Sequence, residues 1–265
     1  MRRISCVKGC VVHGAWPQEL ARHVRVLINP ANNSLTGPQR AAFPRGGPVP
    51  PGGSEAANLK ANHGWDILYP QQAVDGLVHL QGGDELRAAL RRAAPVLEAH
   101  DSGDHLRCRV GEAVLTSGVD GTGSKGPSGL PFDAIVHTVP PFWPRGDDLK
   151  EPAARAQWAD ALRSCYTNSF RLAVEFAAGL GRSGAAAGVA IATPVLGAGA
   201  RGAPFAQAAR VLADAAVQQF GDAQADEQVP HTSSSSLRVV VHSSSLGSSE
   251  LSAVEAALAT AAAER

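Results

Sequence analysis

Four short runs rich in valine and isoleucine, separated by stretches with helical spacing, constrain the fold of this chain most strongly. The runs cover residues 24–28, 134–139, 189–193 and 237–242, and the helical stretches cover residues 83–99, 149–180 and 205–220. Strands buried on both faces read as continuous apolar runs, and their alternation with helices is typical of a sheet covered on both sides. We therefore expect an α/β protein with three layers, α/β/α, around a mixed, mostly parallel central sheet of about six strands.

The length of 265 residues suits one α/β domain with long loops, so we expect a single domain over residues 1–265. Residues 38–70 contain FPRGGPVPPGG and little apolar periodicity, which predicts a proline- and glycine-rich insertion near the ligand edge. Residues 222–236 end in a serine run and predict a polar loop. Alanine-rich residues 251–265 predict a terminal helix.

Charge and cysteine usage argue against several classes of protein. Lys and Arg together number 24, as do Asp and Glu, so we expect no nucleic-acid partner and no membrane partner. The first residues lack the apolar run of a secretory signal, and no stretch approaches the roughly 20 apolar residues that cross a bilayer. The four cysteines form no CxxC motif and no close pairing with histidines, which argues against a zinc site or a disulfide framework. We expect a cytoplasmic or nuclear protein without metal or cofactor, and an organelle targeting segment remains compatible with the sequence.

Three segments indicate a ligand edge. VLINPAN, residues 26–32, leads an apolar strand into two asparagines on a turn set by proline, and asparagine amides suit a hydroxyl-rich ligand such as a ribose. The glycine loop LGAGARGAP, residues 196–204, precedes a helix, where free backbone N–H groups attract anions. An ordinary strand-to-helix turn is the alternative for this loop. VDGLVH, residues 74–79, adds the carboxylate of Asp75, so that the three segments together indicate a nucleotide sugar.

Six segments resemble, in the right order, motifs of the macrodomain family of ADP-ribose-binding modules, and specifically its hydrolytic MacroD-type branch. NPAN at 29–32 is similar to the family's NAAN, and VDGLVH at 74–79 is similar to its VDGAIH. The other four are RCRVGEA at 107–113, IVHTV at 135–139, CYTNS at 165–169 and LGAGARGAP at 196–204. One such match is weak, whereas six in order are specific, and they imply the three-layer macrodomain fold.

The resemblance also implies site residues. Asn32 would hydrogen-bond the distal ribose of ADP-ribose, and Asp75 would orient or activate a water beside its anomeric carbon, with His79 as a third catalytic candidate. The backbone of two loops would hold the diphosphate. The candidate ligand-binding residues are Asn29, Ala31, Gly37, Val74, Gly76, Leu77, Gly197, Ala198, Gly199, Ala200, Arg201 and Gly202.

Structural roles are open for several of these residues. Asp75 has the alternative role of a helix N-cap. His79 lies four residues after it on the same helical turn, and its alternative role is a buried packing residue that the Asp75 carboxylate holds. We expect His137, Cys108 and Cys165 to be packing residues of the core.

The chain also departs from the family pattern. Residues 69–73, YPQQA, stand where the family has three glycines before VDG, so we expect a reshaped first phosphate loop. No carboxylate replaces the family's adenine-binding Asp, because Gly14-Ala15-Trp16 or Gly9-Cys10-Val11 stands there, and Trp16 is either a stacking partner for adenine or a core residue. Arg201 stands where the family often has an aromatic residue over the distal ribose. It is either a solvated loop charge or a contact for a 1″-phosphate.

From this resemblance we expect a hydrolase that binds ADP-ribose and removes a substituent from its terminal ribose. Mono-ADP-ribosylated protein, O-acetyl-ADP-ribose and ADP-ribose 1″-phosphate are the candidate substrates. The alternatives are a reader module that binds ADP-ribose without cleaving it and a scaffold that has lost the ligand. The expected partners are ADP-ribose, its derivatives and mono-ADP-ribosylated proteins.

Overall fold

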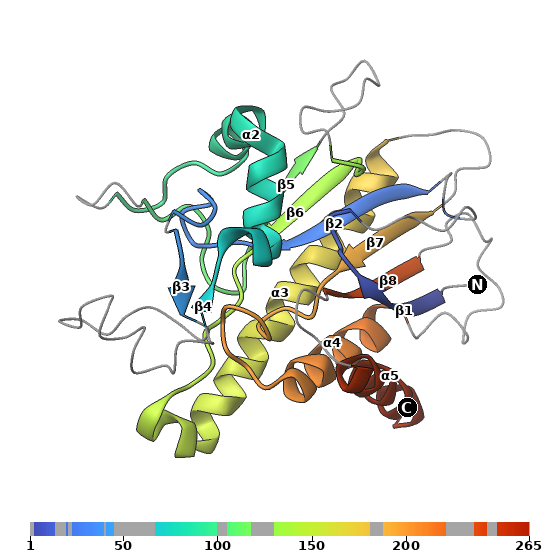
Figure 1. Ribbon diagram of the computed structural model, residues 1–265. Coiled ribbons are helices and arrows are strands. Elements are labelled where there is room, and N and C mark those ends of the chain that lie inside the picture. Colours follow the sequence, from blue (N-terminus) through green and yellow to red (C-terminus); the bar gives the residue numbers. More distant parts are fainter. Residues whose placement is uncertain are drawn as a thin grey trace.

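A six-stranded sheet lies at the centre of the structure, a computed structural model (Figure 1). It describes residues 3–13, 20, 23–39, 41–44, 67–99, 105–117, 130–180, 188–220, 236–242 and 248–264. The strand order is β1-β8-β7-β2-β6-β5. The strands are β1 (Arg3–Gly9), β2 (Val24–Pro30), β5 (Ala113–Ser117), β6 (Ala134–Thr138), β7 (Val189–Thr193) and β8 (Ser236–His242). Only β5 pairs antiparallel in this sheet, so the sheet is mixed and mostly parallel, as predicted.

Helices cover both faces of the sheet and complete the predicted three layers (Figure 1). α2 (Val74–Ala93) lies on one face, where its Val78 packs with Leu27 and Ile135. On the other face, Leu162 of α3 (Pro152–Gly179) packs with Val26, the strand neighbour of Leu27. α4 (Phe205–Phe220) and α5 (Ser248–Ala263) extend that second layer. Successive strand residues point to opposite faces, so the continuous apolar run of β2 supplies both cores.

The helix after the second motif begins earlier than predicted. We expected a helix over residues 83–99, but α2 begins at Val74 and ends at Ala93. Gly83 has φ +53 and ψ −148, so two helical halves meet at a kink. The expected stretch overlaps only the second half of α2 and runs beyond its end. The helix ends just before Pro95, because the residue preceding a proline is disfavoured in the α region.

The structure adds elements that the apolar runs did not predict. β1 and β5 form the two edges of the sheet, and β3 (Phe43–Pro44) pairs antiparallel with β4 (Ile67–Leu68) inside the expected insertion. Residues 45–66 of the insertion and residues 222–235 of the polar loop lie outside the described residues. The predicted terminal helix is α5. Among the described helices, none has the length and apolar character needed to cross a membrane.

Candidate functional site

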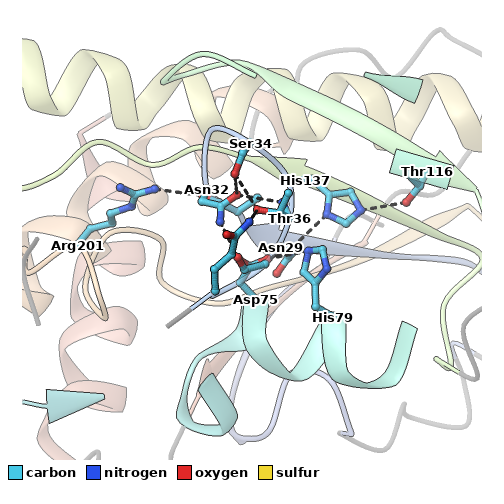
Figure 2. A network of polar contacts seen from close by, with 12 residues as sticks. Asn29, Asn32, Ser34, Thr36, Asp75, His79, Thr116, His137 and Arg201 are labelled. Atoms are coloured by element: carbon cyan, nitrogen blue, oxygen red, sulfur yellow. Dashed lines mark hydrogen bonds and ion pairs between the residues drawn. The ribbon is translucent and has the colours of Figure 1, made fainter. Parts of the chain in front are cut away.

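Asp75 lies in the first turn of α2 and is almost completely buried, with 7% of its surface exposed. The N-cap of α2 is Ala73, and no side chain caps the helix, so the N-cap alternative for Asp75 is wrong. Its Oδ1 atom instead accepts a hydrogen bond of 2.8 Å from Nδ2 of Asn29 (Figure 2). The carboxylate therefore points toward the sheet, at the carboxyl end of β2, where ligands of parallel α/β sheets bind.

The strand register brings Asn29 beside His137. β2 and β6 are parallel neighbours in which these two residues are partners, so both side chains project toward α2. Asn29 Nδ2 lies 3.1 Å from His137 Nδ1, and both residues are 0% exposed. Asn29 was expected to bind ligand, but its amide nitrogen instead holds Asp75. Its Oδ1 atom has no protein partner among the described residues.

Burial determines the electrostatics of Asp75. Removal from water raises the pKa of Asp75, because desolvation disfavours the ionised carboxylate. Three neighbours oppose this shift: the charge of His79, the hydrogen bond from Asn29 and the charge of Arg201. The direction of the shift is upward, which brings the carboxylate closer to the range in which a general base works near neutral pH.

His79 follows Asp75 by one helical turn, as predicted, and its Nε2 lies 3.5 Å from Asp75 Oδ1. Burial lowers the pKa of His79 and raises that of Asp75, so the contact is not a full ion pair at neutral pH. The ring packs against Gly37, whose φ of +76 already favours glycine. A Cβ atom at Gly37 would lie 2.6 Å from the ring, so this glycine sets the place of His79.

Asn32 is half-buried and closes its own loop. Its Nδ2 donates to the carbonyl of Gly37 at 2.7 Å, and its Oδ1 accepts from the Ser34 hydroxyl at 3.1 Å and from the Thr36 N–H at 3.2 Å (Figure 2). An amide nitrogen carries two hydrogens, so one N–H of Asn32 is left for a ligand. This loop-closing role was not predicted from the sequence.

The glycine loop connects β7 to α4 and is closed by its own backbone. Gly202 N–H donates to the Gly199 carbonyl, and Ala203 N–H donates to the Gly197 carbonyl, each at 3.0 Å. Gly197 and Gly202 have φ of +83 and +79, which glycine adopts without strain. Within the described chain, the N–H groups of Gly199, Ala200 and Arg201 have no protein acceptor. The loop is thus both a strand-to-helix turn and a row of N–H groups suited to an anion.

Arg201 joins three loops, so the expectation of a solvated loop charge is wrong. Its Nη2 donates to the Ala31 carbonyl at 3.2 Å, beside Asn32. Its guanidinium lies 4.1 Å from the ring centroid of Phe142, a cation–π contact. Burial lowers the pKa of Arg201, yet no carboxylate lies within ion-pair distance of it among the described residues. Figure 2 shows the guanidinium on the opposite side of Asp75 and Asn32 from His79.

The YPQQA segment, for which we expected a reshaped first phosphate loop, leads directly into α2. Pro70–Gln72 form a short 3-10 helix, η2, and the carbonyl of Pro70 lies so close to Gly76 that a Cβ there would be 1.9 Å away. Val74 and Gly76 are buried and Leu77 is half-buried, and the first helical hydrogen bond runs from Leu77 N–H to the Ala73 carbonyl. η2 therefore packs directly on the first turn that we expected to face the diphosphate.

The cysteines mostly match expectation. Cys108 and Cys165 are buried core residues, and burial raises the pKa of Cys108 to about 12 and of Cys165 to about 11, so both stay protonated thiols. The prediction that no cysteine lies close to a histidine is wrong for Cys10, because its Sγ lies 3.2 Å from His13 Nδ1. In the described ranges, no group of three or more His, Cys, Asp or Glu side chains is placed to hold a metal ion. Residues 14–16, with Trp16, lie outside the described part of the chain.

Comparison with known proteins gives the family. Residues 54–212, more than half of the chain, match the family described as Macro domain. The chain belongs to this family. The macrodomain is 33% identical over 138 residues to an O-acetyl-ADP-ribose deacetylase of Klebsiella pneumoniae, spanning 52% of this chain and 59% of that protein. It is 28% identical over 156 residues to the macro domain-containing protein CT2219 of Chlorobaculum tepidum, spanning 59% and 68% of the two chains.

Solved structures agree on the fold. An Oceanobacillus iheyensis macrodomain with MES bound superposes with a TM-score of 0.56 at 20% identity, covering 99% of this chain and 93% of that one. The same macrodomain with ADP gives a TM-score of 0.52 at 20% identity, covering 92% and 87%. These likenesses confirm the fold, and the deacetylase relative supports the MacroD-type branch that the motifs indicate.

Proposed function

We propose that this macrodomain binds ADP-ribose and hydrolyses a substituent from its terminal ribose. The observation that carries the proposal is the buried Asp75 carboxylate, held by Asn29 and placed beside the Asn32 loop and Arg201. The name of the Klebsiella relative and the ADP in the Oceanobacillus structure support this ligand class. Mono-ADP-ribosylated protein, O-acetyl-ADP-ribose and ADP-ribose 1″-phosphate are the candidate substrates, since all three carry their substituent on the same sugar.

The side chains suit a water-mediated displacement. Asp75 takes a proton from a water, the water oxygen bonds to the carbon or phosphorus of the ester, and the leaving oxygen departs with the bonding electrons and is protonated by solvent. The second N–H of Asn32 orients the ribose, and the N–H groups of the glycine loop bind the diphosphate. The raised pKa of Asp75 makes it a stronger base than an exposed carboxylate.

The test measures release of free ADP-ribose from O-acetyl-ADP-ribose and from mono-ADP-ribosylated protein. Asp75→Asn removes the base but keeps an acceptor for Asn29, so we expect a loss of about 100-fold or more. Asn32→Ala removes a ribose contact and is expected to cost about tenfold. The matched controls are Asp84→Asn and Asn33→Ala, because both residues are exposed and lie close in sequence to the tested ones. Release unchanged in both tested variants contradicts the proposal.

The stability of Asp75→Asn separates catalysis from folding. A carboxyl group whose pKa is raised by folding stabilises the folded protein at low pH, where it is protonated. This stabilisation is lost as pH rises through the raised pKa, because the buried group resists ionisation. At neutral pH the variant is therefore expected to be at least as stable as the wild type, with a gain of about 1 kcal/mol. If Asp75→Asn is inactive but also has a lower melting temperature, the loss of activity is attributed to impaired folding and does not support Asp75 as the base.

A reader that binds ADP-ribose without cleaving it is the second candidate function. It is favoured by one observation, the closing of the Asn32 amide on its own loop, which leaves only one N–H for the sugar. Calorimetric titration with ADP-ribose separates the two functions. Binding without release of ADP-ribose from either substrate identifies a reader, and affinity weaker than about millimolar identifies a scaffold that has lost its ligand.

A further inference from the structure

Behind Asp75 a chain of buried hydrogen bonds extends across the sheet from β2 to β5 (Figure 2). Asn29 Nδ2 contacts both Asp75 Oδ1 and His137 Nδ1, and His137 Nε2 contacts the Thr116 hydroxyl at 2.9 Å. The same hydroxyl lies 3.4 Å from the carbonyl of Ile135, its register partner on β6. Each side chain of this relay, defined as Thr116, His137 and Asn29, is less than one-tenth exposed.

The directions of the hydrogen bonds in the relay follow from the Asp75 carboxylate, which can only accept, so that Asn29 presents Nδ2 to it and to His137. The Thr116 hydroxyl completes this arrangement when it accepts from His137 and directs its single proton to the Ile135 carbonyl. His137 then carries its proton on Nε2, and its Nδ1 accepts from Asn29. Burial lowers the pKa of His137 to about 3, with the charge of nearby His79 adding to the effect, so the ring is neutral and one nitrogen must accept.

This arrangement of His137 and Thr116 favours the orientation in which the nitrogen of the Asn29 amide faces Asp75. A flipped amide would place Oδ1 against the carboxylate oxygen and would need a proton on His137 Nδ1, which the Thr116 bond opposes. We infer that His137 and Thr116 are positioning residues that orient the Asn29 amide so that it donates to Asp75. The inference rests on the proposed role of Asp75 and assigns a role to a histidine that the sequence analysis treated as core packing.

The relay supports the ionised form of Asp75. Among the described residues, the other charged groups that act on that carboxylate are His79 from α2 and Arg201 from the glycine loop, and neither lies in the relay. A hydrogen bond donated to a carboxylate favours its ionised form. Loss of the relay therefore raises the pH at which Asp75 loses its proton, while His79 and Arg201 keep their effects.

Thr116→Val is the sharpest variant because it keeps the shape of the side chain and removes only the hydroxyl. Thr116→Ser is its control, since it keeps the hydroxyl. His137→Leu removes both ring nitrogens, and His137→Asn keeps an acceptor close to the position of Nδ1. The measurement is the titration of the Asp75 carboxyl carbon by ¹³C NMR, together with the ¹⁵N shifts of the His137 ring in the wild type.

We expect the Asp75 titration to move to higher pH in Thr116→Val and His137→Leu, and to stay near the wild-type position in Thr116→Ser and His137→Asn. If the protein hydrolyses its substrate, kcat/KM of the first two variants falls by about threefold or more near pH 5 relative to pH 8. The NMR titration needs no activity, so failure of the hydrolase proposal leaves this test intact. An unmoved titration in a folded Thr116→Val, or a His137 proton on Nδ1, overturns the inference.

Discussion

At the scale of single residues, the site combines a buried carboxyl group, Asp75, and a half-buried guanidinium, Arg201, which do not form an ion pair with each other in the described structure. Among the described residues, Asp75 has a hydrogen bond from Asn29 and a long contact to His79, and Arg201 contacts a carbonyl oxygen and an aromatic ring. A half-buried guanidinium without a carboxylate partner favours an anion, because its remaining N–H groups can form bidentate bonds to carboxylate or phosphate oxygens. We therefore expect the charge of Arg201 to influence which substrate the proposed hydrolase prefers.

Arg201→Ala tests that choice by comparing two substrates in one variant. Turnover of ADP-ribose 1″-phosphate is expected to fall about tenfold more than turnover of O-acetyl-ADP-ribose, because only the phosphate loses a charge-assisted contact. Any loosening of the loop affects both substrates and cancels in the ratio. Arg163→Ala, at an exposed ion pair on α3, is the control. Equal losses on the two substrates would remove Arg201 from substrate selection.

At the scale of elements, two glycines of the glycine loop have different reasons to be glycine: one is required by the backbone conformation, and the other is not. Gly197 has a φ of +83 and lies close to Leu162 and Trp158, so its glycine is needed for the backbone itself. Gly199 lacks a positive φ, and a Cβ atom there would meet nothing within 4 Å. The turn therefore does not explain the glycine at 199, and we propose that the close approach of a diphosphate does.

Gly199→Ala is expected to leave the melting temperature unchanged and to weaken ADP-ribose binding about tenfold, because the methyl group occupies space next to the free N–H groups. Gly197→Ala is expected to lower stability by about 1 kcal/mol through backbone strain. Gly179→Ala, at the end of α3 and also in open space, is the control for both. Unchanged binding by a folded Gly199→Ala contradicts the cradle role of the loop.

At the scale of the whole molecule, buried histidines make stability depend on pH. Burial lowers the pKa of His137 from 6.5 to about 3 and also lowers that of His79. The unfolded chain therefore takes up protons at these sites below pH 6.5, whereas the folded chain does not, and stability is lost as pH falls toward 3. Asp75 acts in the opposite sense, because its raised pKa favours the folded state at low pH.

His137→Asn is expected to flatten this dependence. Urea unfolding between about pH 6 and 4 should show a wild-type slope steeper than that of the variant by up to about 1.4 kcal/mol per pH unit, the value for one proton. Val136→Ala, at the adjacent position on the opposite face, is the control, since its cavity cost does not depend on pH. Parallel curves for wild type and His137→Asn would show that His137 does not drive the acid response.

The fold was predictable from local patterns to a large extent. The bounds of β7 and α4 follow from an apolar run and a helical periodicity that their own residues contain. β1 and β5 were not predicted, because edge strands mix polar and apolar residues and so lack a continuous apolar run. The start of α2 was predicted too far toward the C-terminus, because two glycines interrupt the helical pattern at the kink.

The sequence alone determined the family, the order of the loops and the chemical types at the site, since motifs keep their spacing whatever surrounds them. Only the tertiary structure decided which partners these side chains have. The register of β2 against β6 set Asn29 beside His137, and the packing of the loops set Arg201 on Ala31 and Phe142. Such contacts join residues distant in the chain, and their geometry depends on strand pairing and burial that no local pattern encodes.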